Sequence, residues 1–344
     1  MSVTEPYMPL LAVTMGDPAG IGPEIAVKTF SEDSLYSICR PLLIGHIPTL
    51  LETLAELELD FELNPVHNIS EAKFNTDSID VIPIGEKYPE TVQKSVVSAV
   101  AGDIAFEAVK KAIDLAMRKE VDATVTGPIQ KESLNLAGHH FSGHTEIYAH
   151  YTGTEKYAML LAEENIKVIH VTTHVSLKQA CDLIRKSRIV DVIKLLEEGL
   201  QKLGIPDPRI GVAGLNPHSG EGGLFGDEEI NEISPAVMEA RELGIDVEGP
   251  VPADSLFALA SGGKYDGCVA MYHDQGHIPF KLMGFNWDRK NKTMKSVKGV
   301  NISLGLPIIR TSVDHGTAFE IAGKGKASPD AMKQAIEYAI KLVN

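Results

Sequence analysis

Short apolar stretches alternate with longer amphipathic ones along most of this chain. Residues 10–14 (LLAVT) are continuously apolar, which is typical of a buried strand, and a predicted helix follows from Pro23 to about Phe30. Proline suits a helix start, because its missing N–H would have no partner there. The same apolar pattern predicts further strands at 40–46, 123–129, 157–162, 166–174, 209–218, 265–273 and 306–312.

Helical periodicity fills most of the intervals between these strands. The longest predicted helix covers 94–119, where apolar residues recur at helical spacing. The other predicted helices lie at 48–57, at 176–204 in two pieces, at 228–244 with an interruption near Pro235, and at 329–342. Strands that alternate with helices predict a layered α/β architecture. The polar and basic stretch 286–298 is typical of a linker.

Composition and charge narrow the class of protein. A chain of 344 residues, 44% of them hydrophobic, favours a soluble protein with about two domains. The net charge of -15 argues against a nucleic-acid partner, whose phosphates would be repelled. Cys39, Cys181 and Cys268 are widely spaced and form no CxxC pair, so neither a disulfide framework nor a thiolate zinc site is expected.

Targeting signals are not recognised in the sequence. The opening MSVTEPYMPLLAVTMG lacks the basic start and the long apolar centre of a signal peptide. No apolar run is long enough to span a membrane. Together with the sparse cysteines, this favours a cytoplasmic protein that has no membrane partner.

Three of the predicted strands end in a histidine, at His174, His218 and His273. Ligands of open α/β sheets bind beyond the carboxyl ends of the strands. Three imidazoles there could converge on one divalent metal ion and leave a coordination position open for a substrate. Each histidine alone could be an ordinary loop residue, but the polar and glycine-rich residues that flank His218 and His273 favour a site.

Basic and hydroxyl side chains near other predicted strand ends suggest an anion-binding site. Lys281 follows His273 by eight residues, and Arg310 lies in the apolar stretch LPIIRTS. Both could supply the positive charge that a phosphorylated or carboxylated substrate needs. Thr145 could cap a helix, or with His144 it could contact a phosphate or hydroxyl group.

Two carboxylates and two glycine-rich turns leave alternatives open. Asp254 and Asp274 are candidates for acid–base catalysis or for orienting a ligand, and Asp254 could equally be a helix N-cap. The turn at 14–22 could bind an anion at a helix start or merely permit close packing. The loop at 314–325 could approach a flat ligand or be an ordinary loop. The nucleotide, zincin and serine-hydrolase motifs GxGxxG, GxxxxGK[ST], HExxH and GxSxG are absent.

Several motifs between residues 14 and 325 resemble one known family. TMGDPAGIGPE, GHTE, GLNPHSGEGG, MYHDQGHIPFK, GVNISLGLPIIRTSVDHGTA and AGKG are similar to the PdxA family, the 4-hydroxythreonine-4-phosphate dehydrogenases of vitamin B6 synthesis and their paralogues. HGTAFEIAGKGKASP also resembles the adenosine-binding loop of isocitrate and isopropylmalate dehydrogenases, whose fold the family shares.

The resemblance implies a fold and a set of roles. It implies a two-domain α/β fold similar to isocitrate and isopropylmalate dehydrogenases, with 1–135 and 305–344 in one domain and 136–304 in the other. The active site is expected in the interdomain cleft of a homodimer, completed by the partner subunit. The implied metal ligands are His174, His218 and His273, for Zn, Mg, Co, Mn or Ni. The implied substrate-binding residues are His144, Thr145, Lys281, Asn301 and Arg310. The implied NAD-binding residues are His315, Gly316, Thr317, Ala318 and Gly323.

The segment 287–297 bears on the substrate. Biosynthetic members of the family are shorter between Lys281 and Asn301, and the insertion resembles paralogues that oxidise 4-phospho-D-threonate or 4-phospho-D-erythronate. We therefore expect NAD-linked oxidation of the C3 hydroxyl followed by decarboxylation to dihydroxyacetone phosphate. Asp254, Asp274 and Lys281 remain alternative catalytic bases. The alternative substrate is 4-phosphohydroxy-L-threonine, giving 3-amino-2-oxopropyl phosphate. A metal-dependent hydrolase or aldolase and a non-catalytic metabolite binder are alternatives of another class.

Overall fold

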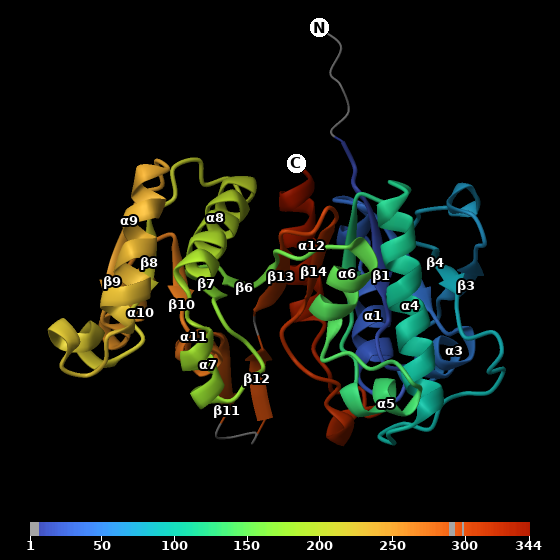
Figure 1. Ribbon diagram of the computed structural model, residues 1–344. Coiled ribbons are helices and arrows are strands. Elements are labelled where there is room, and N and C mark those ends of the chain that lie inside the picture. The colour runs from blue at the N-terminus through green and yellow to red at the C-terminus, as the bar shows by residue number, and fades with distance from the viewer. Residues whose placement is uncertain (1–6, 289–292, 298) are drawn as a thin grey trace, which may run out of the picture. The chain divides into compact units, whose positions relative to one another are not determined.

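The chain folds into two compact α/β units. The computed structural model describes residues 7–288, 293–297 and 299–344 (Figure 1). Unit 1 contains Met1–Thr154 and Leu306–Asn344, and unit 2 contains Glu155–Gly305. The stretch 136–154, which we assigned to the second domain, therefore lies in unit 1. The reason is apolar packing, because Ile147 and Tyr148 share one buried cluster with Phe106 and Val109.

Unit 1 is built on a six-stranded sheet in which every pairing is parallel. Its strands, in spatial order, are β3 (Glu62–Pro65), β4 (Ser78–Pro83), β2 (Arg40–Gly45), β1 (Leu10–Thr14), β5 (Ala123–Thr126) and β14 (Ile309–Val313). All residues of β1 and β5 are buried, as expected for a parallel sheet that is covered on both faces.

Helices cover this sheet, as the blue, green and red ribbons of Figure 1 show. They are α1 (Gly22–Phe30), α2 (Asp33–Tyr36), α3 (Ile47–Glu56), η1 (Ile69–Glu71), α4 (Ala99–Met117), α5 (Lys131–Leu136), α6 (His144–Thr152), η4 (Phe319–Ile321) and α12 (Asp330–Val343). Helix α4 begins at Ala99, five residues after its predicted start at 94. Ser98 is the N-cap of this helix and accepts a hydrogen bond from the Ala101 N–H. A Cβ at Gly102 would lie 2.0 Å from the Ser133 carbonyl oxygen, so this glycine permits the close contact of α4 with α5.

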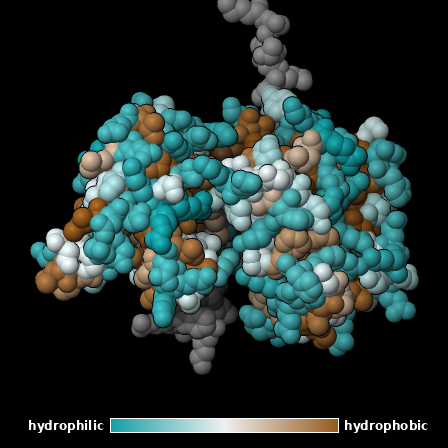
Figure 2. All heavy atoms as spheres, viewed as in Figure 1, coloured by the Kyte–Doolittle hydropathy of each residue, from teal (hydrophilic) through white to brown (hydrophobic). Residues whose placement is uncertain are grey.

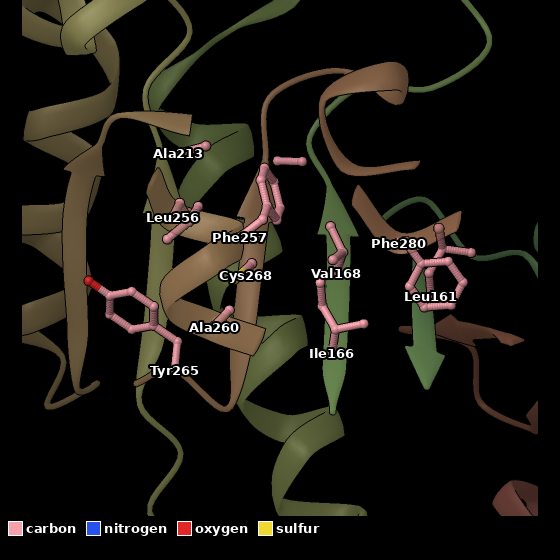
Figure 3. Packing of buried hydrophobic residues seen from close by; sticks show 11 residues of the cluster. Leu161, Ile166, Val168, Ala213, Leu256, Phe257, Ala260, Tyr265, Cys268 and Phe280 are labelled. Atoms are coloured by element: carbon pink, nitrogen blue, oxygen red, sulfur yellow. The ribbon is translucent and has the colours of Figure 1, made fainter. Parts of the chain in front are cut away.

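Unit 2 contains a mixed sheet. Its strands, in spatial order, are β13 (Val300–Leu304), β6 (Ala158–Glu163), β7 (Ile166–His170), β10 (Gly267–Ala270), β8 (Ile210–Ala213) and β9 (Val247–Val251). The pairs β13–β6 and β6–β7 are antiparallel, and the other pairs are parallel. Leu256, Phe257 and Ala260 pack on the strands in one apolar core cluster (Figure 3).

The remaining elements of unit 2 are helices and helical turns that connect these strands. They are α7 (Leu177–Leu183), α8 (Lys186–Lys202), η2 (Pro217–Gly223), the π-helical turn η3 (Glu229–Ile233), α9 (Ser234–Glu242), α10 (Ala253–Ser261) and α11 (His273–Gly284). The stretch predicted as a linker instead forms an antiparallel ribbon of β11 (Phe285–Asp288) and β12 (Thr293–Val297). Part of the insertion at 287–297 lies outside the described residues.

Two further features of the chain concern its cysteines and its helices. Cys39, Cys181 and Cys268 are all free thiols. In the part of the chain that the structure describes, no helix combines the length and the apolarity needed to cross a bilayer.

A carboxylate network ties α4 to two loops of unit 1. Asp103 accepts hydrogen bonds from Lys87 Nζ at 2.6 Å, Tyr88 OH at 2.9 Å and His139 Nε2 at 2.9 Å. Burial acts to raise the pKa of Asp103, but the bonds from Lys87, His139 and Tyr88 together outweigh it and hold the pKa at about 2.

This network predicts a pH dependence of stability. A carboxyl pKa lowered by folding stabilises the fold above its unfolded pKa, and this stabilisation is lost as the pH falls through the folded value of about 2. Asp103→Asn should therefore lower the free energy of unfolding by about 2 kcal/mol at pH 7. The difference from the wild type should shrink between about pH 4 and pH 2, measured by urea unfolding. The exposed Asp77→Asn is the control, and a constant difference across this range would contradict the assignment.

Candidate functional site

The histidines that we expected at strand ends lie a few residues beyond those ends. Strands β7, β8 and β10 end at His170, Ala213 and Ala270. His174 and His218 lie in the loops after β7 and β8, and His273 is the first residue of α11. The predicted strands were too long because the residues just after them, such as Val171 and Met271, are still buried.

His174 and His273 line one pocket of unit 2. This pocket has a volume of about 260 Å³, and Asp274, Thr172 and Tyr272 also line it. The centroids of the two imidazole rings lie 5.9 Å apart. The carboxylate Oδ1 of Asp274 lies 2.7 Å from His273 Nδ1, which orients the ring and leaves Nε2 for another contact.

Two further histidines lie against or near His273, and neither was predicted as a site residue from the sequence. The His277 ring stacks on the His273 ring at a centroid distance of 3.7 Å, and His277 Nδ1 lies 3.0 Å from the His273 carbonyl oxygen. The ring of the fully buried His170 lies 4.7 Å from that of His277. Burial, and then the charge of His273, lower the pKa of His277 to about 4. The i, i+4 spacing from His273 was the available signal for His277.

His218 lies apart from this pair. It sits in η2 with φ of 53°, and its ring faces Phe225 at 6.2 Å. Among the described residues, no three His, Cys, Asp or Glu side chains gather closely enough to hold a metal ion. The donors His174 and His273 fit a divalent metal chemically, but a metal centre of three histidines would need a ligand from beyond this pair.

The other predicted catalytic residues of unit 2 lie along α10 and α11. Asp254 is the second residue of α10, whose N-cap is Pro252, so the predicted N-cap role for Asp254 is not observed. Asp254 and Asp274 line an apolar groove of about 600 Å³. Lys281 lies two turns after His273 on α11. This helix was not predicted, because Gly276 and Pro279 interrupt the helical pattern.

Asn301 lies in β13, and its side-chain oxygen is buried. That Oδ1 has no hydrogen-bond partner within the described residues. A buried acceptor of this kind is favourable when a ligand donates to it.

Unit 1 holds a buried cation. Arg310 is the second residue of β14 rather than a strand end, and only 2% of it is exposed. Its Nη2 donates to Thr126 Oγ1 at 2.8 Å, and its guanidinium lies 5.6 Å from the centre of the Tyr148 ring. Burial lowers the pKa of Arg310 to about 10. A buried guanidinium in such a setting favours an anionic ligand.

His144 and Thr145 open helix α6 in the same unit. The N-cap of α6 is Gly143, so Thr145 is the second helical residue and does not cap the helix. Burial, and then the charge of Arg310, hold the pKa of His144 well below its usual range. His144 is therefore neutral at physiological pH and can donate one hydrogen bond and accept another.

The predicted cofactor loop packs on the glycine-rich turn. The Ile21 N–H donates to the Thr317 carbonyl at 3.0 Å, and a Cβ at Gly20 would lie 2.8 Å from that oxygen. Lys28 Nζ donates to the carbonyls of Gly325 and Ala327 at 3.0 and 2.8 Å. Gly20 thus permits close packing, which is one of the two roles predicted for this turn. The loop that carries the predicted NAD-binding residues is fixed to α1. Those residues are His315, Gly316, Thr317, Ala318 and Gly323.

Asp17 in this turn was not singled out from the sequence. It is fully buried and accepts a hydrogen bond from the Ala19 N–H at 2.8 Å. Burial raises its pKa to about 6 despite that bond. A carboxyl with such a pKa can exchange a proton near neutral pH.

Comparison with known proteins identifies close relatives. Residues 37–339 match the family of the pyridoxal phosphate biosynthetic protein PdxA. The D-threonate 4-phosphate dehydrogenase of Salmonella typhimurium is 47% identical over 334 residues, which cover 96% of this chain and 98% of that protein. The enzyme of the same name from Pectobacterium atrosepticum is 46% identical, over 97% of this chain and 99% of its own.

A solved structure matches the fold over nearly the whole chain. The 4-hydroxythreonine-4-phosphate dehydrogenase of Klebsiella pneumoniae superimposes with a TM-score of 0.83 and 46% identity, covering 98% of this chain and all of its own. The resemblance predicted from the sequence motifs is therefore confirmed.

Proposed function

Because this chain belongs to the PdxA family, we propose that it is a dehydrogenase that uses NAD to oxidise the C3 hydroxyl of D-threonate 4-phosphate. The observation that carries this proposal is the 47% identity, over 96% of the chain, to an enzyme of that name. Hydride passes from C3 to NAD, and the hydroxyl proton passes to a base. The resulting β-keto acid then loses carbon dioxide to give dihydroxyacetone phosphate.

The buried cation of unit 1 supports the choice of an anionic substrate. Arg310 would bind an anionic end of the substrate, with His144 and Thr145 as hydrogen-bonding partners. Lys281 and Asn301 of unit 2 are also proposed as substrate-binding residues. Fixing an anionic end would restrict the motion of the substrate before hydride transfer, which lowers the entropic part of the barrier.

The loop 314–325 would bind NAD through its backbone. The contacts of Thr317 and Gly325 with α1 hold the loop in place before any ligand binds. Such preorganisation reduces the ordering cost of cofactor binding. This mode of binding needs no GxGxxG motif.

His174, His218 and His273 would hold a divalent metal ion. When bound, such an ion acts as a Lewis acid towards oxygen atoms of the substrate. Asp274 would orient His273 through the bond at 2.7 Å, and is then not the base. We assign proton transfer to Lys281 Nζ, which lies on the same helix as His273.

We further propose that the active enzyme is a homodimer whose partner completes the metal site. The exposed Leu224 and Phe225 follow His218, and hydrophobic atoms show at the surface of the loop after β8 (Figure 2). The apolar groove between α10 and α11 shares Tyr272 and Asp274 with the pocket of His174 and His273. If Leu224 and Phe225 of a second copy entered this groove, they would bring the loop that carries that copy's His218 beside the pocket. The two-fold symmetry of such a dimer would repeat the contact at the other site. Such an enzyme would work in the cytoplasm.

The groove makes the dimer testable. Leu282 on α11 is 77% exposed and lines the groove. Leu282→Glu should place a charge in the dimer interface and raise the dimer dissociation constant by at least about 10-fold, measured by light scattering or sedimentation. The control is Leu136→Glu, which alters an exposed leucine of unit 1. An unchanged dimer, or a wild-type monomer, would contradict the assigned interface.

A second substrate is favoured by the likeness to the Klebsiella structure, named as a 4-hydroxythreonine-4-phosphate dehydrogenase. The deciding assay follows NADH absorbance with NAD, a divalent metal and either D-threonate 4-phosphate or 4-phosphohydroxy-L-threonine. Faster turnover of the threonate supports the proposal. Faster turnover of the amino acid would instead assign the enzyme to vitamin B6 synthesis. No NADH with either, or with D-erythronate 4-phosphate, in metal-replete protein would overturn the dehydrogenase proposal and favour a hydrolase or aldolase.

A further inference from the structure

The turn that carries His218 has an unusual backbone. Six consecutive residues have positive φ, namely His218, Ser219, Gly220, Glu221, Gly222 and Gly223. Three of these six carry side chains, for which the left-handed region is unfavourable. A backbone of this kind persists only where its surroundings hold it in place.

The buried carboxylate of Glu229 contacts the two residues just before this turn and the middle of the turn. Glu229 is 3% exposed, and its Oε1 accepts hydrogen bonds from the Leu215 and Asn216 backbone N–H groups, both at 2.7 Å. Its Oε2 accepts a bond from Asn216 Nδ2 at 2.9 Å. A Cβ at Gly220 would lie 2.8 Å from Oε2, so the middle of the turn packs directly on the carboxylate.

The carboxylate and the turn depend on each other. A buried carboxylate is strongly unfavourable unless hydrogen bonds replace its water. The described donors to Glu229 come from the two residues just before the turn. Glu229 is also the first residue of the π-helical turn η3 (Glu229–Ile233), and Ile233 at its other end is fully buried. Insertions of this kind often occur at functional sites.

We propose that Glu229 is a positioning residue for His218. The carboxylate of Glu229 fixes the backbone just before the left-handed turn. The turn, once fixed, sets the direction of the His218 imidazole. Its importance for metal binding rests on the proposed function, in which His218 is a metal ligand. The hold on the backbone does not depend on that function.

The first measurement is backbone hydrogen exchange in the full-length protein without metal. In Glu229→Ala, the Leu215 and Asn216 amides lose their acceptor, and they should exchange at least about 10-fold faster. Glu229→Gln should show a smaller increase, because its carboxamide oxygen can keep both backbone bonds while its NH₂ group faces Asn216 Nδ2. Strand β8 (Ile210–Ala213) is the internal reference, and Asp227→Asn removes one exposed charge from the same segment as the matched control.

The second measurement is Zn²⁺ affinity, by competition with a chromophoric chelator. Glu229→Ala should weaken Zn²⁺ binding by about 10-fold to 100-fold, Glu229→Gln by less, and Asp227→Asn not at all. Unchanged exchange at Leu215 and Asn216 in Glu229→Ala would overturn the proposal. If only Glu229→Gln folds, unchanged exchange together with unchanged Zn²⁺ affinity in that variant would overturn it. Faster exchange with unchanged affinity would also overturn it, provided that His218→Ala weakens binding. If His218→Ala leaves the affinity unchanged, the proposed metal site fails, and the role of Glu229 as a positioning residue for a ligand fails with it.

Discussion

Arg310→Met is expected to destroy substrate recognition while making the unliganded protein more stable. Truncating a buried charge that binds an oppositely charged partner costs about 2–5 kcal/mol, so kcat/KM should fall by about 30-fold to 4,000-fold. Most of the loss should appear in KM if Arg310 contacts a part of the substrate that does not change during the reaction. Steady-state kinetics with D-threonate 4-phosphate and calorimetric binding would measure both.

The stability of the same variant should change in the opposite direction. The pKa of Arg310, lowered by burial to about 10, shows that the fold disfavours its charge. A group of this kind costs stability at pH 7, and the cost begins to fall only as the pH rises above about 10, towards the unfolded pKa. Replacement by an apolar side chain of similar size should raise the free energy of unfolding by about 1–3 kcal/mol. The exposed Arg118→Met is the control, and an unchanged KM in Arg310→Met would place the anion site elsewhere.

His218→Ala is expected to remove most of the metal-dependent activity. Loss of one of three protein ligands should weaken Zn²⁺ binding by at least about 10²-fold and reduce turnover at limiting metal to a similar degree. Chelation of the wild-type enzyme should have the same effect and should be reversed by added metal. The exposed His67→Ala is the control. Full activity and unchanged affinity in His218→Ala would refute the three-histidine site.

Mixing two inactive variants distinguishes a site within one chain from a site shared between two. If His218 and His273 of one site come from different subunits, a dimer of His218→Ala with His273→Ala has one intact site and one doubly altered site. Random exchange of subunits should then restore about a quarter of the wild-type sites. If both ligands come from one chain, mixing should restore nothing.

The layered α/β fold could be predicted because its central strands are buried on both faces and therefore apolar throughout. The ends of the strands could not, because residues such as Val171 stay buried after the hydrogen-bonded pairing has ended. Helix α11 was missed because Gly276 and Pro279 interrupt the pattern that a helix normally shows. The boundary near 136 was wrong because the helix after it packs on Phe106, a contact that local periodicity does not encode.

The candidate site was predictable to the extent that residue types identify chemistry. Imidazoles near strand ends and Arg310 in an apolar stretch pointed to metal and anion binding. Glu229 and His170 could not be found this way, because buried polar residues acquire their partners only from tertiary packing. Nor could spacing show that His218 lies apart from His174 and His273, since this depends on the direction of a left-handed turn.

The way in which the two units share the chain has a consequence for synthesis. Every strand of unit 2 lies within one unbroken stretch, Glu155–Gly305, whose first and last strands, β6 and β13, pair with each other. Unit 1 is split, and its strand β14 and helix α12 come after that stretch. A ribosome therefore completes unit 2 while the sheet of unit 1 still lacks β14, the partner of β5. Unit 1, whose synthesis begins before that of unit 2, is therefore the unit that is completed last.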